Sequence, residues 1–281
     1  MANTLKVPGA CLYYEIRGSG PALLLISGGP TDADVYAGLA PVLADKYTVV
    51  TYDPRGNSRS TAESPAADWG IDVHGDDAAR LVDAIGKGPA DVFGNSGGAL
   101  VGLNLAARYP EKVRAVVAHE PPAVELLPDA AVHRARSQEV YDTYRNQGVG
   151  PAMQKFLALA GLKGGPPPQA AAGPPSPEMM ERMARMGRTM ELFLAHGMQE
   201  AGAFVPDIAA LRAGSPRILI AGGEASGDQL AYRAAVAVAE RLGTTIVHFP
   251  GDHGGFTTHP EAFAVRLQEV LADDKGIFGR T

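Results

Sequence analysis

The strongest constraint on the fold of this chain is the alternation of short apolar runs with longer segments of helical spacing. Parallel strands covered on both faces are apolar throughout, and a helix returns the chain after each. The alternation therefore predicts an α/β protein with a mostly parallel, doubly wound sheet. The expected strands are 12–16 (antiparallel), 22–26, 47–52, 90–93, 113–118, 217–221 and 244–249, and the expected helices are 34–45, 72–85, 99–108, 229–242 and 260–271.

The alternation stops between residues 121 and 206, where no strand pattern occurs. We therefore expect a core domain of residues 1–120 and 207–281, with 121–206 inserted as a helical cap. Helical segments are expected at 131–146, 152–162 and 178–199, with a loop rich in glycine and proline at 164–177. The cap has a dense group of methionines, expected to pack in a helical core or to form an adaptable wall over an apolar pocket: Met179, Met180, Met183, Met186, Met190 and Met198.

Composition narrows the function classes. The 281 residues have a net charge of −6 and no basic block, so nucleic acid and membrane are not expected as partners. A small neutral or apolar molecule fits better, and a homodimer is left open. Neither a signal peptide nor an apolar run of roughly 20 residues is present, which favours a cytoplasmic protein, and the abundance of arginine, alanine and glycine suggests a bacterial one. The lone Cys11 is expected to be buried and to bind no metal.

The segment Gly94-Asn95-Ser96-Gly97-Gly98 lies where a strand-like run meets a helical one. A serine in so tight a turn, flanked by glycines two residues away on each side, has the layout of a nucleophile elbow. We expect Ser96 to be the nucleophile and Asn95 to orient the turn. An oxyanion hole needs two backbone amides, for which we expect Gly97 and, from the loop after strand 22–26, Gly29.

A serine hydroxyl needs a base, and histidine has the side-chain pKa nearest neutrality. His253 follows the last expected strand in a glycine-rich loop, at the sheet edge to which the elbow also points. It is therefore the expected base. Among the other histidines, the weaker candidates are His119, His248 and His259, and the ordinary helix residues are His74, His133 and His196.

Together these motifs resemble the α/β-hydrolase superfamily over nearly the whole chain. The similar stretches are Ser27-Gly28-Gly29-Pro30, the run from Tyr52 to Ser60, the elbow and the histidine loop. Gly56-Asn57-Ser58-Arg59-Ser60, His119-Glu120 and Phe249-Pro250-Gly251 are further similar to the zearalenone lactonase group. Asp53 and Arg55 are expected to hold a structural turn.

The acidic partner of His253 has three candidates. Most members of the superfamily have an aspartate after the strand that follows the cap, but Gly222-Gly223-Glu224-Ala225 has alanine there. Glu224, Asp228 and Glu120 could each replace it. Glu120 is favoured because a carboxylate at the active edge of the sheet needs a partner, and because the resemblance to the lactonase group implies this position.

The resemblance implies a serine hydrolase that needs neither metal nor organic cofactor. We expect Ser96 to attack an ester or lactone carbonyl of a small apolar substrate, with His253 and Glu120 completing the triad. A carbon–carbon bond hydrolase or a cofactor-free perhydrolase would use the same triad. A ligand-binding member of the fold without turnover is the alternative from a different class.

Overall fold

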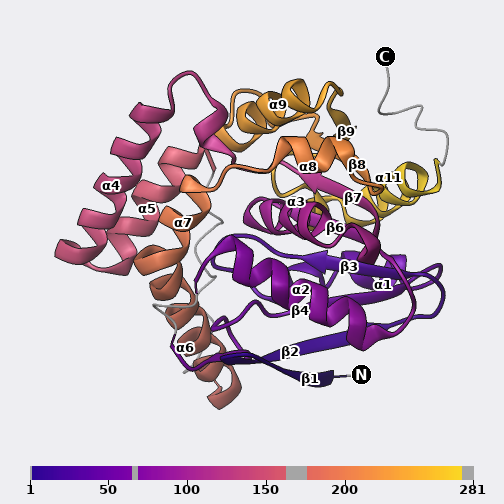
Figure 1. Ribbon diagram of the computed structural model, residues 1–281. Coiled ribbons are helices and arrows are strands. Elements are labelled where there is room, and N and C mark those ends of the chain that lie inside the picture. Colours follow the sequence, from indigo (N-terminus) through magenta and orange to yellow (C-terminus); the bar gives the residue numbers. More distant parts are fainter. Residues whose placement is uncertain (1, 65–68, 163–175, 274–281) are drawn as a thin grey trace.

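The computed structural model describes residues 2–64, 69–162 and 176–273, within which nine strands form one sheet with helices on both faces (Figure 1). The strand order is β1-β2-β4-β3-β6-β7-β8-β9, with β5 paired to β2. Pairs that involve β2 are antiparallel, and those from β4 to β9 are parallel. The strands are β1 (Ala2–Val7), β2 (Ala10–Arg17), β3 (Ala22–Ile26), β4 (Thr48–Tyr52), β5 (Thr61–Ala62), β6 (Ala90–Asn95), β7 (Val113–His119), β8 (Arg217–Gly223) and β9 (Val247–Phe249). The predicted fold class is confirmed.

The central strands are apolar because both of their faces are buried. Every residue of β3 is buried, with Leu24 in one hydrophobic layer and Leu23 and Leu25 in the other. The first layer contains α2 (Ile71–Ile85), α3 (Gly97–Arg108), α8 (Ile208–Ala213) and α9 (Leu230–Leu242), and the second contains α1 (Leu39–Leu43), α10 (Gly255–Thr258) and α11 (Pro260–Ala272). These layers hold the carboxyl ends of the parallel strands in register.

Two predicted elements are shorter than expected. The helix predicted over 34–45 is divided into a 3-10 turn, Ala33–Tyr36, and α1. Pro41 lies in the first turn of α1 and lacks the amide that a longer helix would require there. The strand predicted over 244–249 begins only at Val247, because β9 pairs with just the last three residues of β8. The N-terminal strand β1 pairs along β2 and was not predicted. Its sequence mixes polar and apolar residues, and most of its side chains are exposed or half-buried.

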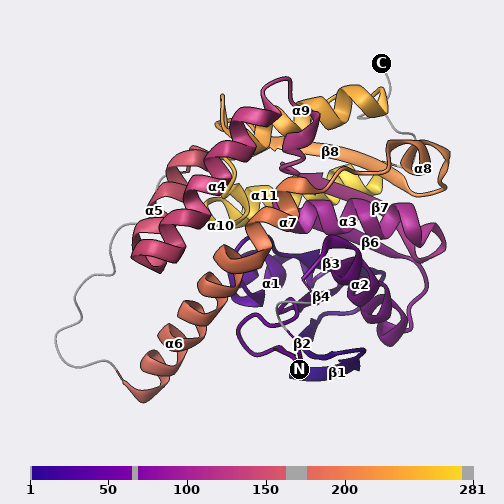
Figure 2. The ribbon, with the colours of Figure 1, turned by 60° about the vertical axis from the view of Figure 1, so that its left-hand side comes forward.

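Between β7 and β8 the described residues form helices and no strand. Figure 2 shows these helices grouped beside the sheet layers, with α6 extending away from them. Besides a 3-10 turn (Val124–Leu126) and α8, the segment contains α4 (Ala130–Gln147), α5 (Val149–Ala160), α6 (Pro177–Leu192), a π-helical turn (Phe193–Gly197) and α7 (Met198–Ala203). They enclose a small core of their own, built around Val140, Ala152, Phe193 and Leu194. The predicted loop at 164–177 lies, apart from its last two residues, outside the described residues.

The methionines of α6 do not fill a core. Met179, Met180, Met183 and Met186 are between 48% and 60% exposed, so the expectation of core packing is wrong for these four. Met198 is buried. Cys11 is half-buried rather than buried, since it lies in β2 near the sheet edge. No helix in the described ranges is long and apolar enough to cross a membrane.

Candidate active site

Ser96 lies at the turn between β6 and α3, with φ 55° and ψ −124°. This backbone conformation is strained for a residue with a side chain. The turn is tight because glycines let backbones meet: a Cβ on Gly94 would lie 2.3 Å from the Gly98 oxygen, and one on Gly98 would lie 2.1 Å from the Ile26 oxygen. The Ser96 amide donates to the His119 carbonyl at 2.9 Å, which ties the elbow to β7.

The loop after β3 lies directly against the elbow. A Cβ on Gly28 would lie only 2.5 Å from the Gly97 nitrogen, so this position requires glycine. A Cβ on Gly97 would be 3.6 Å from the Gly29 nitrogen, which brings the two amides expected for the oxyanion hole to neighbouring positions. Gly97 is the first residue of α3, so its amide has no partner within the helix.

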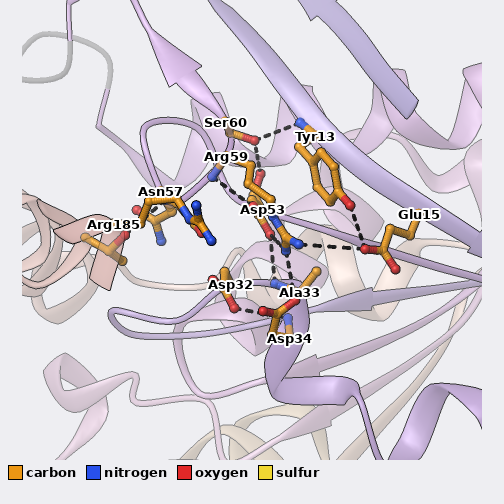
Figure 3. A network of polar contacts seen from close by, with 12 residues as sticks. Tyr13, Glu15, Asp32, Ala33, Asp34, Asp53, Asn57, Arg59, Ser60 and Arg185 are labelled. Atoms are coloured by element: carbon orange, nitrogen blue, oxygen red, sulfur yellow. Dashed lines mark hydrogen bonds and ion pairs between the residues drawn. The ribbon is translucent and has the colours of Figure 1, made fainter. Parts of the chain in front are cut away.

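A network of polar contacts joins this loop to the loop after β4 (Figure 3). The buried carboxylate of Asp53 accepts hydrogen bonds from the Ala33 amide at 2.9 Å and from the Arg59 Nε at 2.7 Å. Asn57 Nδ2 donates to the Thr31 carbonyl at 3.0 Å. The loops after β3 and β4 are therefore joined, in keeping with the structural role expected for Asp53. Arg55 forms a buried ion pair with Asp77 of α2.

His253 lies in the loop after β9 and pairs with Glu120. The His253 Nδ1 is 2.6 Å from the Glu120 Oε2. The Asn95 Nδ2 donates to the His253 carbonyl at 3.2 Å, which links the histidine loop to the elbow. Ser96 and His253 line one pocket. The structure thus brings together Ser96, His253 and Glu120 from three loops at the carboxyl edge of the sheet.

Glu120 follows β7 with φ 50°, and its side chain is completely buried. Burial alone would raise its pKa, but hydrogen bonds from His253 and Gly223, with the nearby imidazoles, lower the pKa to about 2. Its Oε1 accepts from the Gly223 amide at 2.9 Å and from the Ser226 hydroxyl. The carboxylate is therefore ionised and held by neutral donors.

The loop after β8 does not supply the carboxylate that pairs with His253. Glu224 and Asp228 are both exposed, and His253 pairs with Glu120 instead. This loop supplies the Gly223 amide and the Ser226 hydroxyl that bind Glu120. Ser226 was missed from the sequence, because a lone serine in a turn gives no signal until its partner is known.

The other histidines occupy varied environments. His119 is fully buried beside the elbow, and burial lowers its pKa to about 4, which leaves it neutral. His248 is exposed and 3.2 Å from the Tyr232 hydroxyl. His74 and His133, interpreted from the sequence as ordinary helix residues, both line the pocket of Ser96. Both do lie in helices, and the docking of α2 and α4, which the sequence did not indicate, brings them to the pocket.

The pocket encloses about 1090 Å³, including its opening to solvent. Its walls come from the sheet edge and from the inserted helices, with Phe156, Leu159 and Phe193 among the apolar residues. No lysine, arginine, aspartate or glutamate lines it within the part of the chain that the structure describes. The described residues also contain no group of three or more metal-ligand side chains.

Comparisons with known proteins agree with this fold. Residues 21–200 match the family model of the alpha/beta hydrolase fold. The chain is 37% identical to an uncharacterized hydrolase, YraK, of Bacillus subtilis (strain 168), over 97% of each protein. It is 34% identical to a 2-(acetamidomethylene)succinate hydrolase of Mesorhizobium japonicum, over 38% of each. A crystal structure of a hydrolase from Pseudomonas aeruginosa, 23% identical, superposes with a TM-score of 0.74 over 96% of this chain and 98% of that one. The chain therefore belongs to the α/β-hydrolase fold family and is a hydrolase of that fold.

Proposed function

We propose that the protein is a serine hydrolase that cleaves an uncharged carboxylic ester or lactone through an acyl-enzyme. The observation that carries the proposal is the buried Glu120–His253 pair, whose 2.6 Å contact faces the same pocket as the strained elbow serine. A buried, ionised carboxylate fixes the tautomer of the histidine and stabilises the imidazolium that forms during the reaction. The free Nε2 is then left to act on Ser96.

The mechanism has two half-reactions. Ser96 Oγ attacks the carbonyl carbon while its proton passes to His253, and the Gly29 and Gly97 amides bind the resulting oxyanion. The intermediate collapses, and His253 protonates the departing alkoxide to release the alcohol. Water then loses a proton to His253 and attacks the acyl-enzyme. Collapse of the second intermediate returns the proton to Ser96 and releases the carboxylic acid.

The lining of the pocket supports an uncharged substrate. A succinate derivative carries two carboxylates, and sites for such groups generally use arginine or lysine. The described lining has neither, although the Mesorhizobium relative is named for a substrate of that kind. We therefore expect a substrate chemistry different from that relative's. We keep lactones in the proposed substrate class because the motifs are similar to those of zearalenone lactonases. The relatives reported above support only membership of the broader α/β-hydrolase family.

Active-site labelling tests the proposal. A fluorophosphonate probe is expected to modify Ser96, as located by peptide mass spectrometry, and to leave Ser96→Ala protein unmodified. Labelling should parallel loss of turnover on 4-nitrophenyl acetate and hexanoate and on δ-valerolactone. No labelling at high probe concentration would favour a ligand-binding protein. Turnover of a vinylogous diketone, or peroxide-dependent oxidation in the presence of acetate, without ester turnover would favour the other two reactions.

A further inference from the structure

One wall of the pocket carries polar atoms that have no partner. Tyr52 at the end of β4, Trp69 before α2 and His74 within α2 all line the pocket. The Tyr52 Oη, the Trp69 Nε1 and the His74 Nε2 are buried, and none has a hydrogen-bond partner among the described residues. The Ser27 Oγ and the His133 Nδ1, from two other lining residues, are buried without such a partner as well. Native proteins pair nearly all such atoms, so their number at one pocket points to a missing partner.

These three side chains are uncharged. Burial, with the nearby Arg55 charge, lowers the pKa of His74 to about 3. Burial, with the Asp77 charge, raises the pKa of Tyr52 well above its usual value. At neutral pH the wall therefore offers two hydrogen-bond donors, an indole N–H and a phenol O–H, beside a neutral imidazole.

Charged groups near this wall are already paired with each other. The Arg55 Nε donates to the Asp77 Oδ2 at 2.8 Å, and a second nitrogen donates to the Oδ1 at the same distance. Both side chains are almost fully buried, and neither lines the pocket. A charged ligand group would therefore meet no opposite charge here, whereas a neutral oxygen would find donors.

The wall is also held in place. The Trp69 and His74 rings meet edge to face with centroids 4.5 Å apart. A Cβ on Gly197 would lie 2.7 Å from the Trp69 ring, so Trp69 also packs directly on the π-helical turn. Because both contacts fix the indole, the donor is positioned before a ligand arrives.

We propose that Tyr52, Trp69 and His74 form a subsite for an uncharged oxygen of the substrate, a hydroxyl or keto group separate from the carbonyl that is cleaved. This inference rests on the proposed function, since it names the substrate class of the same pocket. The ligand oxygen would accept from Tyr52 and Trp69. A hydroxyl could in addition donate to the His74 Nε2, whereas a keto oxygen could only accept from it in the tautomer that carries the proton there.

The test compares 4-nitrophenyl hexanoate with its 5-oxo and 6-hydroxy analogues. The native protein should prefer at least one oxygenated ester by at least about 10-fold in kcat/KM. Tyr52→Phe should lower that preference severalfold, and Tyr36→Phe should retain it. Tyr36 is the matched control: it is equally buried, but its hydroxyl already donates to the Ile26 carbonyl at 2.8 Å and it does not line the pocket.

Thermal unfolding separates a binding role from a structural one. Because the Tyr52 hydroxyl has no partner, Tyr52→Phe should leave Tm unchanged or raise it, whereas Tyr36→Phe should lower it. Equal turnover of all three esters, or a preference that survives in Tyr52→Phe, would overturn the subsite and leave the proposed function intact. If no ester is hydrolysed, the proposed function fails. The subsite is then tested by calorimetry, in which Ser96→Ala protein should bind at least one oxygenated ester about 10-fold more tightly than the hexanoate, and Tyr52→Phe should lower this ratio.

Discussion

Two histidines that line the same pocket each contact a carboxylate. At the sheet edge, the His253 Nδ1 meets the Glu120 Oε2 at 2.6 Å. In the inserted helices, the His133 Nε2 lies 3.2 Å from the Asp129 Oδ2. His253 and His133 both line the pocket, yet the carboxylates differ: Glu120 is fully buried, and the Asp129 side chain is 38% exposed.

Their further partners differ as well. Glu120 accepts from neutral donors, Gly223 and Ser226, which leave its negative charge uncancelled beside His253. Asp129 also accepts from an Arg233 nitrogen at 3.0 Å to each oxygen. A charge that is already neutralised and exposed to water stabilises an imidazolium weakly. The comparison teaches that sharing a pocket does not make a histidine a base, because the burial of its carboxylate matters too.

The largest effect on activity is expected when the His253–Glu120 pair at the sheet edge is broken. Glu120→Gln should lower kcat by about 10³- to 10⁴-fold on an ester substrate, since the amide cannot stabilise the imidazolium. Asp129→Asn should change kcat by less than about threefold. Steady-state kinetics with Glu224→Gln and Asp228→Asn as exposed controls check this. A larger loss in either control than in Glu120→Gln would overturn the triad.

Two further histidines, His119 and His74, are buried without a hydrogen-bonded carboxylate, and they should make the stability of the protein depend on pH. The pKa of His119 is lowered from 6.5 to about 4 and that of His74 from 6.5 to about 3. Between these values and 6.5 the unfolded chain binds protons that the native state does not, so stability falls as pH falls. The slope should approach about 1.4 kcal/mol per pH unit for His74 between pH 6 and 4, and for His119 only around pH 5, since its native form begins to bind a proton as the pH nears 4. Urea unfolding across this range measures it, and a flat profile would contradict it.

A smaller effect tests the neutral donors of Glu120. Ser226→Ala removes one of them without altering the charge. We expect a loss of about 10-fold in kcat with little change in KM, because the carboxylate loses orientation rather than its partner. Ser226→Thr, which keeps the hydroxyl, should recover part of the activity. An equal loss in both variants would indicate a packing role.

The smallest effect is expected from Arg233, the cation that holds Asp129 of the His133–Asp129 pair. Arg233→Gln removes the side chain that holds Asp129, which should leave kcat within about twofold. Any change should fall on KM for bulky esters, since His133 only lines the pocket. A fall in kcat as large as that of Ser226→Ala would show that the two pairs are more alike than their burial indicates.

The elbow and the sheet could be predicted because their signals are local. Gly94 and Gly98 are required by contacts within a few residues of Ser96 or by the adjacent strand. The expected core packing of Met179, Met180, Met183 and Met186 was wrong because it depends on contacts that are not local. Thioether density indicates apolar packing, but whether that face of α6 meets another element depends on how α6 docks, which its own spacing does not encode.

By itself, the sequence determined the α/β architecture, the position of Ser96 between strand and helix, and His253 in the loop after the last strand, since periodicity and turn chemistry are short-range properties. The sequence favoured Glu120 over Glu224 and Asp228 on a resemblance and a burial argument, and the tertiary structure shows the contact itself. Only the tertiary structure revealed Ser226 and the grouping of Tyr52, Trp69 and His74 at the pocket. Those contacts join residues far apart in the chain, and burial in a shared core decides them.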